Sequence, residues 1–298
     1  MTSWAVAASD EVAQEFAERA ALDGASALQC ALSGYFAAAG AHPGVLLGPL
    51  TVLLFGFGAR RVFDGRVRQP GLGAKRPRGF TTGQEVAEAA RVGVMCSPIA
   101  AFVALSYDTQ SSRSQVTKAG ESLAKKAGAP RRAQLLAALS RLGASAFTTE
   151  LIRPVLREAG LAEGGLVTAQ DFARVPAVDQ PCSISQAPSG TRLGVPWLGP
   201  SDPQQSVCTL DARGNAVCLC YERSEDGLPI ADWDLLAPPR AVPVMRGVPR
   251  VTPGEPLPAP ARLAIELDDS GRLRAASADW SDDDLTTAAV RVLRPSVS

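Results

Sequence analysis

Helical and strand patterns occur in separate blocks along this chain, and their order constrains the fold more than any other feature of the sequence. Apolar residues at helical spacing predict helices over residues 10–22, 25–39, 98–105 and, in three pieces, 111–160. Paired strand patterns with turn residues between them predict three hairpins, 50–55 with 59–63, 207–210 with 216–221, and 262–267 with 272–276. Because the strands pair with each other rather than alternate with helices, we expect a layered α+β fold.

Four other segments complete this reading of the chain. Residues 92–96 predict a further strand, and the proline-rich residues 234–260 predict irregular structure. Residues 176–203 combine Pro, Gly, Ser and Gln without any period, which predicts a long surface linker. The acidic run that follows Ser281 predicts a last helix over 282–293.

The charge balance argues against two classes of partner. The 298 residues contain 30 Lys and Arg and 30 Asp and Glu, so the formal net charge is zero. Nucleic-acid and anionic-membrane binding both rely on a basic surface, so we expect neither. We expect a protein partner or self-association, and the composition does not indicate whether such a partner is acidic or basic.

Histidine and cysteine usage limits the chemistry further. His42 is the only histidine, so multi-histidine zinc sites cannot form. The six cysteines show no CxxC spacing, which predicts free thiols, and we expect no metal and no cofactor. The N-terminus lacks a basic start followed by an apolar core, so we expect the protein in the cytoplasm.

Several segments, in order, match the motifs of one protein family. Residues 24–31 read GASALQCA, residues 64–66 read DGR with Pro70 after them, and residues 164–172 read GGLVTAQDF. They resemble the GGNAVDAA, D-F-R-E-x-A-P and G-G-x-x-T-x-x-D-L motifs of γ-glutamyltransferase, an N-terminal-nucleophile hydrolase. The resemblance implies a four-layer αββα sandwich formed by one domain over residues 1–298. Within it, residues 1–175 resemble the large subunit, 176–203 are the linker and 204–298 resemble the small subunit.

The most consequential match lies just after the predicted linker. Residues 204–217 read QQSVCTLDARGNAV and resemble T-T-H-x-S-V-V-D-x-D-G-N-A-V, where the family cleaves itself and exposes the first threonine. Gln204 stands at that position, and an amide cannot act as the nucleophile. We therefore expect no self-cleavage.

Two further departures weaken the case for catalysis. The family's S-S-M segment falls near residues 257–260, and its oxyanion-binding glycine pair falls near residues 276–280, and neither pattern is kept. Asp279 would repel a developing oxyanion at the second position. The chain is also much shorter than typical members of the family.

Arg66 is the one candidate for substrate binding. The resemblance places it where the family binds the α-carboxylate of the glutamyl group, a role that suits a guanidinium. Arg60, Arg61 and Arg68 lie nearby, so the alternative interpretation is a solvated basic edge of a strand and turn.

Ser206, Cys208 and Thr209 lie close enough to Gln204 to replace it as nucleophile after a shifted cleavage. The alternative is structural, because strand alternation puts Ser206 and Cys208 on one face and Thr209 on the other. A buried Cys208 would then serve as a small apolar residue.

These observations lead to one functional prediction and two alternatives. We expect a catalytically inactive γ-glutamyltransferase-like protein that stays uncleaved and acts as a binding or structural component of an assembly, so its enzyme activity is doubtful. The first alternative is an active γ-glutamyl transferase or hydrolase with a displaced Ser or Cys nucleophile. The second is an amino-acid-binding sensor that uses Arg66.

Overall fold

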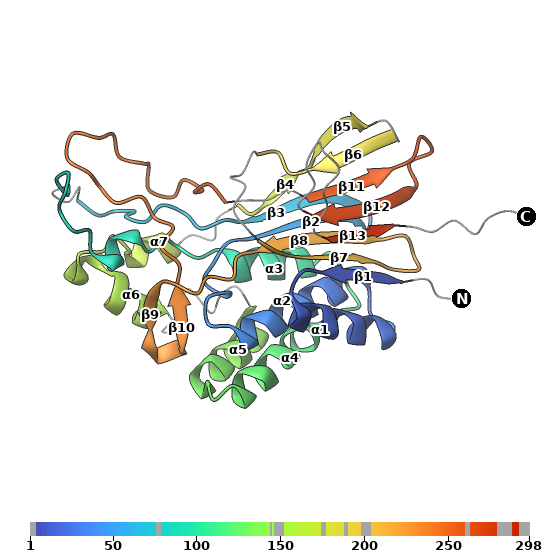
Figure 1. The fold of residues 1–298 in the computed structure, drawn as a ribbon, viewed down its shortest axis with the longest axis horizontal. Helices are drawn as coiled ribbons and strands as arrows, with labels where there is room; N and C mark the ends of the chain where they lie inside the picture. Colours follow the sequence, from blue (N-terminus) through green and yellow to red (C-terminus); the bar gives the residue numbers. More distant parts are fainter. Residues whose placement is uncertain are drawn as a thin grey trace, which may run out of the picture.

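Two antiparallel β-sheets packed face to face form the centre of the molecule (Figure 1). The computed structural model describes residues 4–75, 79–143, 145, 152–173, 177–187, 190–197, 204–259, 263–278 and 288–291. In the six-stranded sheet the order is β1 (Ala5–Ala8), β7 (Gln205–Leu210), β8 (Ala216–Tyr221), β2 (Leu50–Gly56), β3 (Ala59–Gly65) and β4 (Asp179–Pro181). In the five-stranded sheet it is β13 (Ala288–Arg291), β12 (Leu273–Ala278), β11 (Leu263–Leu267), β6 (Gly190–Gly194) and β5 (Ser183–Ala187).

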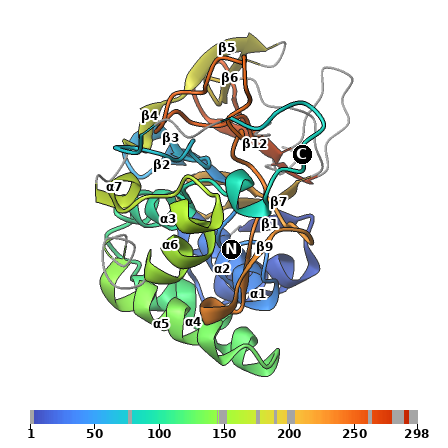
Figure 2. The same ribbon diagram turned by 90° about the vertical axis from the view of Figure 1, so that its left-hand side faces the viewer.

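The helices lie on one side of this sandwich. They are α1 (Glu11–Leu22), α2 (Ala27–Ala41), α3 (Ser97–Leu105), α4 (Arg113–Lys126), α5 (Pro130–Leu142), α6 (Arg153–Ala159) and α7 (Ala169–Ala173). A separate small hairpin consists of β9 (Leu228–Ile230) and β10 (Leu235–Ala237). Within the described ranges no helix covers the outer face of the five-stranded sheet (Figures 1 and 2). None of the helices in those ranges has the length and apolar character needed to span a bilayer.

Helix α2 is the central helix of the helical layer, and nearly all of its residues are buried. Its N-cap Ser26 accepts a hydrogen bond from the backbone N–H of Gln29, and Asp10 caps α1 in the same way. Helices α1 and α4 both pack against α2. Gly40 of α2 and Gly120 of α4 meet backbone to backbone, and a Cβ atom on either would collide with a carbonyl oxygen of the other helix.

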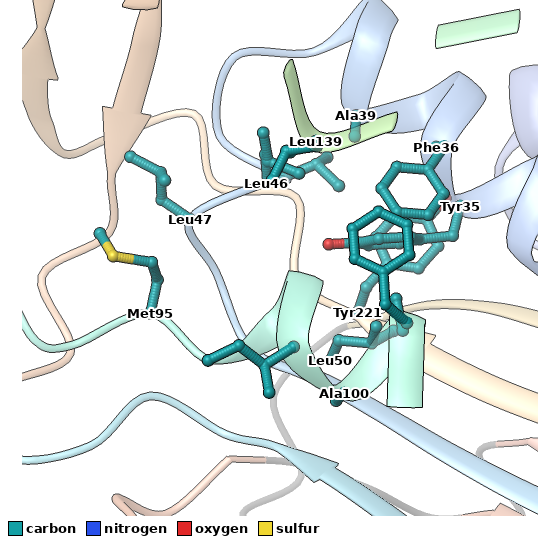
Figure 3. Packing of buried hydrophobic residues seen from close by; sticks show 14 of the residues in the cluster. Tyr35, Phe36, Ala39, Leu46, Leu47, Leu50, Met95, Ala100, Leu139 and Tyr221 are labelled. Atoms are coloured by element: carbon teal, nitrogen blue, oxygen red, sulfur yellow. The ribbon is translucent and has the colours of Figure 1, made fainter. Parts of the chain in front are cut away.

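Apolar side chains fill both layers of the interior. Aromatic rings join the helices to the six-stranded sheet: Tyr35 lies edge-on to Phe36 and to Tyr221, with ring centroids 5.0 and 5.5 Å apart (Figure 3). A second cluster lies between the two sheets and includes Leu53, Cys208 and Ile265. The predicted α+β sandwich is confirmed, as are the helices near residues 10–22, 25–39 and 98–105 and all three hairpins. Within the described ranges the helices form one outer layer (Figures 1 and 2), whereas the αββα arrangement implied by the resemblance has two.

Two predictions about local structure were wrong. Residues 92–96 form no strand, and only Val94 makes a bridge, to Arg68. Residues 176–203 are not an irregular linker, because β4, β5 and β6 lie within them. Edge strand β5 is largely exposed and therefore lacks the apolar alternation that signals a strand.

The prediction of a last helix over residues 282–293 was wrong for residues 288–291, which the structure describes. Residues 288–291 form β13, which pairs antiparallel with β12 from Ala288 opposite Ala278 to Arg291 opposite Ala275. Pairing with a neighbouring strand thus outweighs the helix-capping signal. Residues 282–287 of that prediction lie outside the described residues.

Candidate active site

Gln204 and Arg66, which the sequence singled out, lie at the end of the six-stranded sheet where β7 begins. Across the sheet, Gln205 lies opposite Tyr221, Tyr221 opposite Leu50, and Leu50 opposite Gly65. Gln204 and Arg66 therefore lie at the same edge, separated by three strand spacings, or about 14 Å. The structure brings the two residues to one end of one sheet without direct contact.

The start of β7 is held by Ser9, which follows β1. The Ser9 hydroxyl accepts a hydrogen bond from the backbone N–H of Ser206 at 2.8 Å and donates one to Oε1 of Gln205 at 2.9 Å. The backbone N–H of Ser9 also donates to the carbonyl of Ser206. Gln205 thus continues the β1–β7 pairing with its side chain, and both glutamines at this position present amides.

The three candidate replacement nucleophiles are all buried. Ser206 is 2% exposed, and its hydroxyl makes no hydrogen bond in the described part of the chain. Thr209 is 0% exposed and donates to the carbonyl of Ala27 at 2.7 Å, which fixes its hydroxyl on the helix side of the sheet. Among the described residues, neither hydroxyl is hydrogen-bonded to a side chain that could serve as a base.

Cys208 lies between the two sheets, directly opposite Cys218. Burial raises the pKa of Cys218 well above its ordinary value, and the neighbouring Cys208 raises it further. The Cys218 thiol donates to the carbonyl of Ala264. This is the environment of buried apolar thiols, as the strand alternation predicted for Cys208.

Arg66 is held in a buried ion pair. Its Nε and Nη2 donate to the two carboxylate oxygens of Asp64 at 2.9 and 2.8 Å, and its backbone N–H donates to Oδ1 of the same residue. The Trp197 ring lies against the guanidinium, 3.9 Å from its carbon to the ring centroid. Gln180 donates to the second carboxylate oxygen of Asp64. Two of the guanidinium nitrogens that would grip a ligand carboxylate are thus already bonded.

Sequence reasoning missed the partners of Arg66 and the role of Ser9. Asp64 was available as a signal, because it belongs to the same quoted motif as Arg66. Trp197 and Gln180 come from the segment read as a linker, so no local pattern pointed to them. Ser9 precedes the N-cap Asp10 of α1, and no local pattern indicated that its hydroxyl binds the start of β7.

The single histidine lies at the C-terminal end of α2, close to the end of the sheet where β7 begins. Nε2 of His42 is 3.7 Å from Oδ2 of Asp10, and Arg223 approaches the same oxygen at 3.4 Å. Burial lowers the pKa of His42, and the Arg223 guanidinium lowers it further, against the opposing effect of Asp10. His42 is therefore neutral near neutral pH.

This lowered pKa predicts a pH dependence of stability. Because the unfolded chain protonates His42 more readily than the folded protein, stability falls as pH drops through the ordinary histidine pKa of about 6.5. Between about pH 8 and about pH 5.5 we expect wild type to lose more unfolding free energy than His42→Gln. Urea unfolding at both pH values measures this difference, and equal losses in the two proteins would contradict the prediction.

The GG-x-x-T-x-x-D segment is a structural anchor. Gly164 has a positive φ of 78°, and a Cβ atom on Gly165 would collide with the carbonyl oxygen of Ala159. The Thr168 hydroxyl accepts from the backbone N–H of Asp171, and the Asp171 carboxylate accepts from that of Thr168. Asp171 also accepts from the backbone N–H groups of residues 71 and 72, which ties this segment to the loop after β3.

The D-x-x-G-N segment forms the turn between β7 and β8. Asp211 accepts hydrogen bonds from the backbone N–H groups of Arg213 and Asn215 and from that of Ala27 at the start of α2. Asn215 accepts from the backbone N–H of Phe57, in the turn between β2 and β3. This motif therefore joins three segments of the scaffold, at the opposite end of β7 from Gln204.

The family's other two site segments give less information. Leu257 is buried and bonded through its backbone N–H to the carbonyl of Val67. Residues 276–278 belong to β12, whereas Asp279 and Trp280 lie outside the described residues. Among the residues that the structure describes, no group of three or more His, Cys, Asp or Glu side chains is placed to hold a metal ion.

Comparison with solved structures identifies the fold. A structure of LmbA2991 matches with a TM-score of 0.74 and 14% identity over 95% of this chain and 80% of that one. Cephalosporin acylase from Bacillus halodurans matches with a TM-score of 0.71 and 11% identity, over 91% and 77% of the two chains. γ-Glutamyltranspeptidase from Helicobacter pylori matches with a TM-score of 0.52 and 16% identity, over 62% and 68%.

The chain has the fold of the N-terminal-nucleophile hydrolases. The resemblance predicted from the motifs is thus confirmed at the level of fold, and the identities fit a shortened, divergent chain. Neither the protein-family models nor the curated protein sequences give a match. In this fold, Gln204 directly precedes β7 and Gln205 is the first residue of that strand.

Proposed function

We propose that this protein is a catalytically inactive relative of the γ-glutamyltransferases that remains a single uncleaved chain and acts as a binding or structural component of an assembly. The observation that carries the proposal is the amide of Gln204 at the start of β7, where the resemblance places the nucleophile. Self-cleavage and acyl transfer both need a hydroxyl or thiol there.

The burial of the alternative nucleophiles supports this proposal. Cys208 and Thr209 are 0% exposed, inside β7 and paired on both sides by β1 and β8. A new N-terminus at Ser206 would have to form inside the ladder, because Gln205 already pairs with Tyr221. The acyl group of a substrate and an attacking water cannot reach a nucleophile at such a buried position. These observations weigh against a displaced nucleophile.

The amino-acid-sensor alternative depends on Arg66, whose role as a substrate-binding residue stays a prediction. The ion pair with Asp64 competes with a ligand carboxylate for the same N–H groups. For that reason the binding function that we propose does not rely on Arg66. In this proposal the protein binds another protein or a second copy of itself, and it is located in the cytoplasm.

Intact mass and activity test the proposal together. Purified full-length protein is expected to give one species of 31.0 kDa by mass spectrometry and one band on a denaturing gel. Incubation with a chromogenic γ-glutamyl amide is expected to release no more product than a buffer blank. Gln204→Ala should behave identically in both assays, because the amide that it removes is not a nucleophile.

Two results would overturn this reading. The first is a pair of fragments divided next to Gln204. The second is turnover that disappears in Ser206→Ala or Cys208→Ala, which would identify a displaced nucleophile. Light scattering on the native protein then measures whether the chain self-associates, which is the form of assembly that needs no second protein.

A further inference from the structure

A cavity of about 910 Å³ lies at the end of β7 opposite to Gln204. Its floor is one face of α2 and its cap, where Ser26, Gln29 and Ser33 follow at spacings of three and four residues. Residues of α1 and α4 form its walls, and the turn between β7 and β8 lies at one end. This volume is in the range of cavities that hold small organic ligands.

Two carboxylates in the cavity wall are turned toward the protein. Asp108 is 5% exposed and accepts hydrogen bonds from the hydroxyls of Ser26 and Ser111 and from the backbone N–H of Gln110. Asp211 accepts from backbone N–H groups and from the side-chain amide of Asn215. The oxygens of both residues are thus used within the protein, and they leave little accepting capacity for a ligand.

Hydrogen-bond donors, in contrast, are left over in the lining. The carbonyl oxygen of the Gln110 amide accepts from Arg213, while its NH₂ group has no partner among the described residues, and the Gln29 amide contacts the Ser111 hydroxyl, whose single proton is shared with Asp108. The Lys118 ammonium likewise makes no ion pair within the described ranges. Excess donors and a free cation favour a ligand that brings acceptor oxygens and negative charge.

Ser33 provides an independent indication that the cavity accepts a polar group. Its side chain lines the cavity floor and is 5% exposed, and its hydroxyl makes no hydrogen bond in the described part of the chain. The hydroxyl therefore faces the cavity, where water or a polar group of a ligand completes its hydrogen bonding.

Part of the lining is apolar. These residues come from the N-terminal segment, α1 and α4, and they are Trp4, Phe16, Ala20, Ala21, Leu22 and Ala119. Leu22 is 74% exposed and Trp4 38% exposed, and exposed apolar side chains gathered at one cavity are typical of a ligand-binding surface. A ligand of matching shape would therefore carry an apolar body beside its anionic group.

We propose that this cavity binds a small organic acid, with its carboxylate at Lys118 and the amides of Gln29 and Gln110 and its apolar body against Phe16 and α1. The cavity lies at the other end of β7 from Gln204, so binding there does not depend on whether the chain is cleaved. It gives this fold a binding role at a place that shares no residue with the candidate active site.

Binding of naphthylacetate, compared with naphthylethanol, tests the proposal on the full-length protein. The two probes share an apolar body and differ in the anionic group. By calorimetry or ligand-observed magnetic resonance, we expect the acid to bind about tenfold more tightly than the alcohol, because only the acid pairs with Lys118. Equal affinities, or no binding of the acid, would overturn the proposal.

Four variants locate the site. Lys118→Met should weaken naphthylacetate binding about tenfold, whereas Lys126→Met, on the same helix and outside the cavity, should leave it unchanged. Ser33→Ala should weaken binding without lowering the unfolding midpoint, because no hydrogen bond within the protein is lost. Asp23→Asn on the exposed rim should not weaken it, because a negative charge is removed. Equal effects of Lys118→Met and Lys126→Met would show that the acid binds elsewhere.

Discussion

Asp64→Asn is expected to lower the free energy of unfolding by about 3 kcal/mol. Asp64 is 0% exposed, and its carboxylate is the charge partner of Arg66, whose side chain is itself only 13% exposed. Removing the negative charge leaves a guanidinium enclosed beside Trp197 without its counter-ion. Such an uncompensated charge costs far more than an exposed ion pair contributes.

Urea denaturation measures this effect, and a matched substitution controls for the change of side chain. Asp232→Asn removes a carboxylate that also contacts arginines, Arg131 and Arg157, but these groups are exposed to solvent. We expect only a small change there, because water screens the pair. If both variants lost the same amount of unfolding free energy, the ion pair of Arg66 and Asp64 would contribute no more to stability than an exposed ion pair.

Gly120→Ala is expected to destabilise the protein by about 3 kcal/mol, although alanine is the better helix former. Taken alone, helix propensity would make the variant more stable by about 1 kcal/mol. The added Cβ atom would collide with the carbonyl oxygen of Phe36, so α4 must move away from α2. The sign of the change therefore reports directly on the close approach of the two helices.

Thermal and urea unfolding of Gly120→Ala and Ser122→Ala provide the comparison. Ser122 is an exposed residue of the same helix, and its substitution should change stability little. A stabilised Gly120→Ala variant would mean that the helices do not meet at this glycine. The aromatic cluster of Tyr35, Phe36 and Tyr221 would then be less tightly enclosed than it is in the structure.

The elements with strong local signals were predicted well from the sequence. The helix at 10–22 has a cap, an acidic first turn and apolar spacing, and the hairpin around residues 211–215 has turn residues between apolar strands. The segment of β5 and the strand β13 could not be predicted in this way. Both are specified by the neighbours with which they pair, not by their own composition.

The candidate site shows the same division. The position of Gln204 at the beginning of a strand and of Arg66 directly after one follows from local motifs. The ion pair of Arg66 is local as well, but the covering Trp197 is more than a hundred residues away in the chain. The cavity lined by α1, α2 and α4 could not be predicted from the sequence, because each helix contributes only a few scattered polar side chains to it.

The place of the β7–β8 hairpin in the larger sheet has a consequence for how the polypeptide is made. This hairpin, from the last third of the chain, lies between β1 and β2, which are synthesised first. Until it emerges from the ribosome, both early strands expose unpaired edges that invite aggregation. The six-stranded sheet can therefore close only after these late residues have been made, and we expect neither portion to fold as an independent fragment.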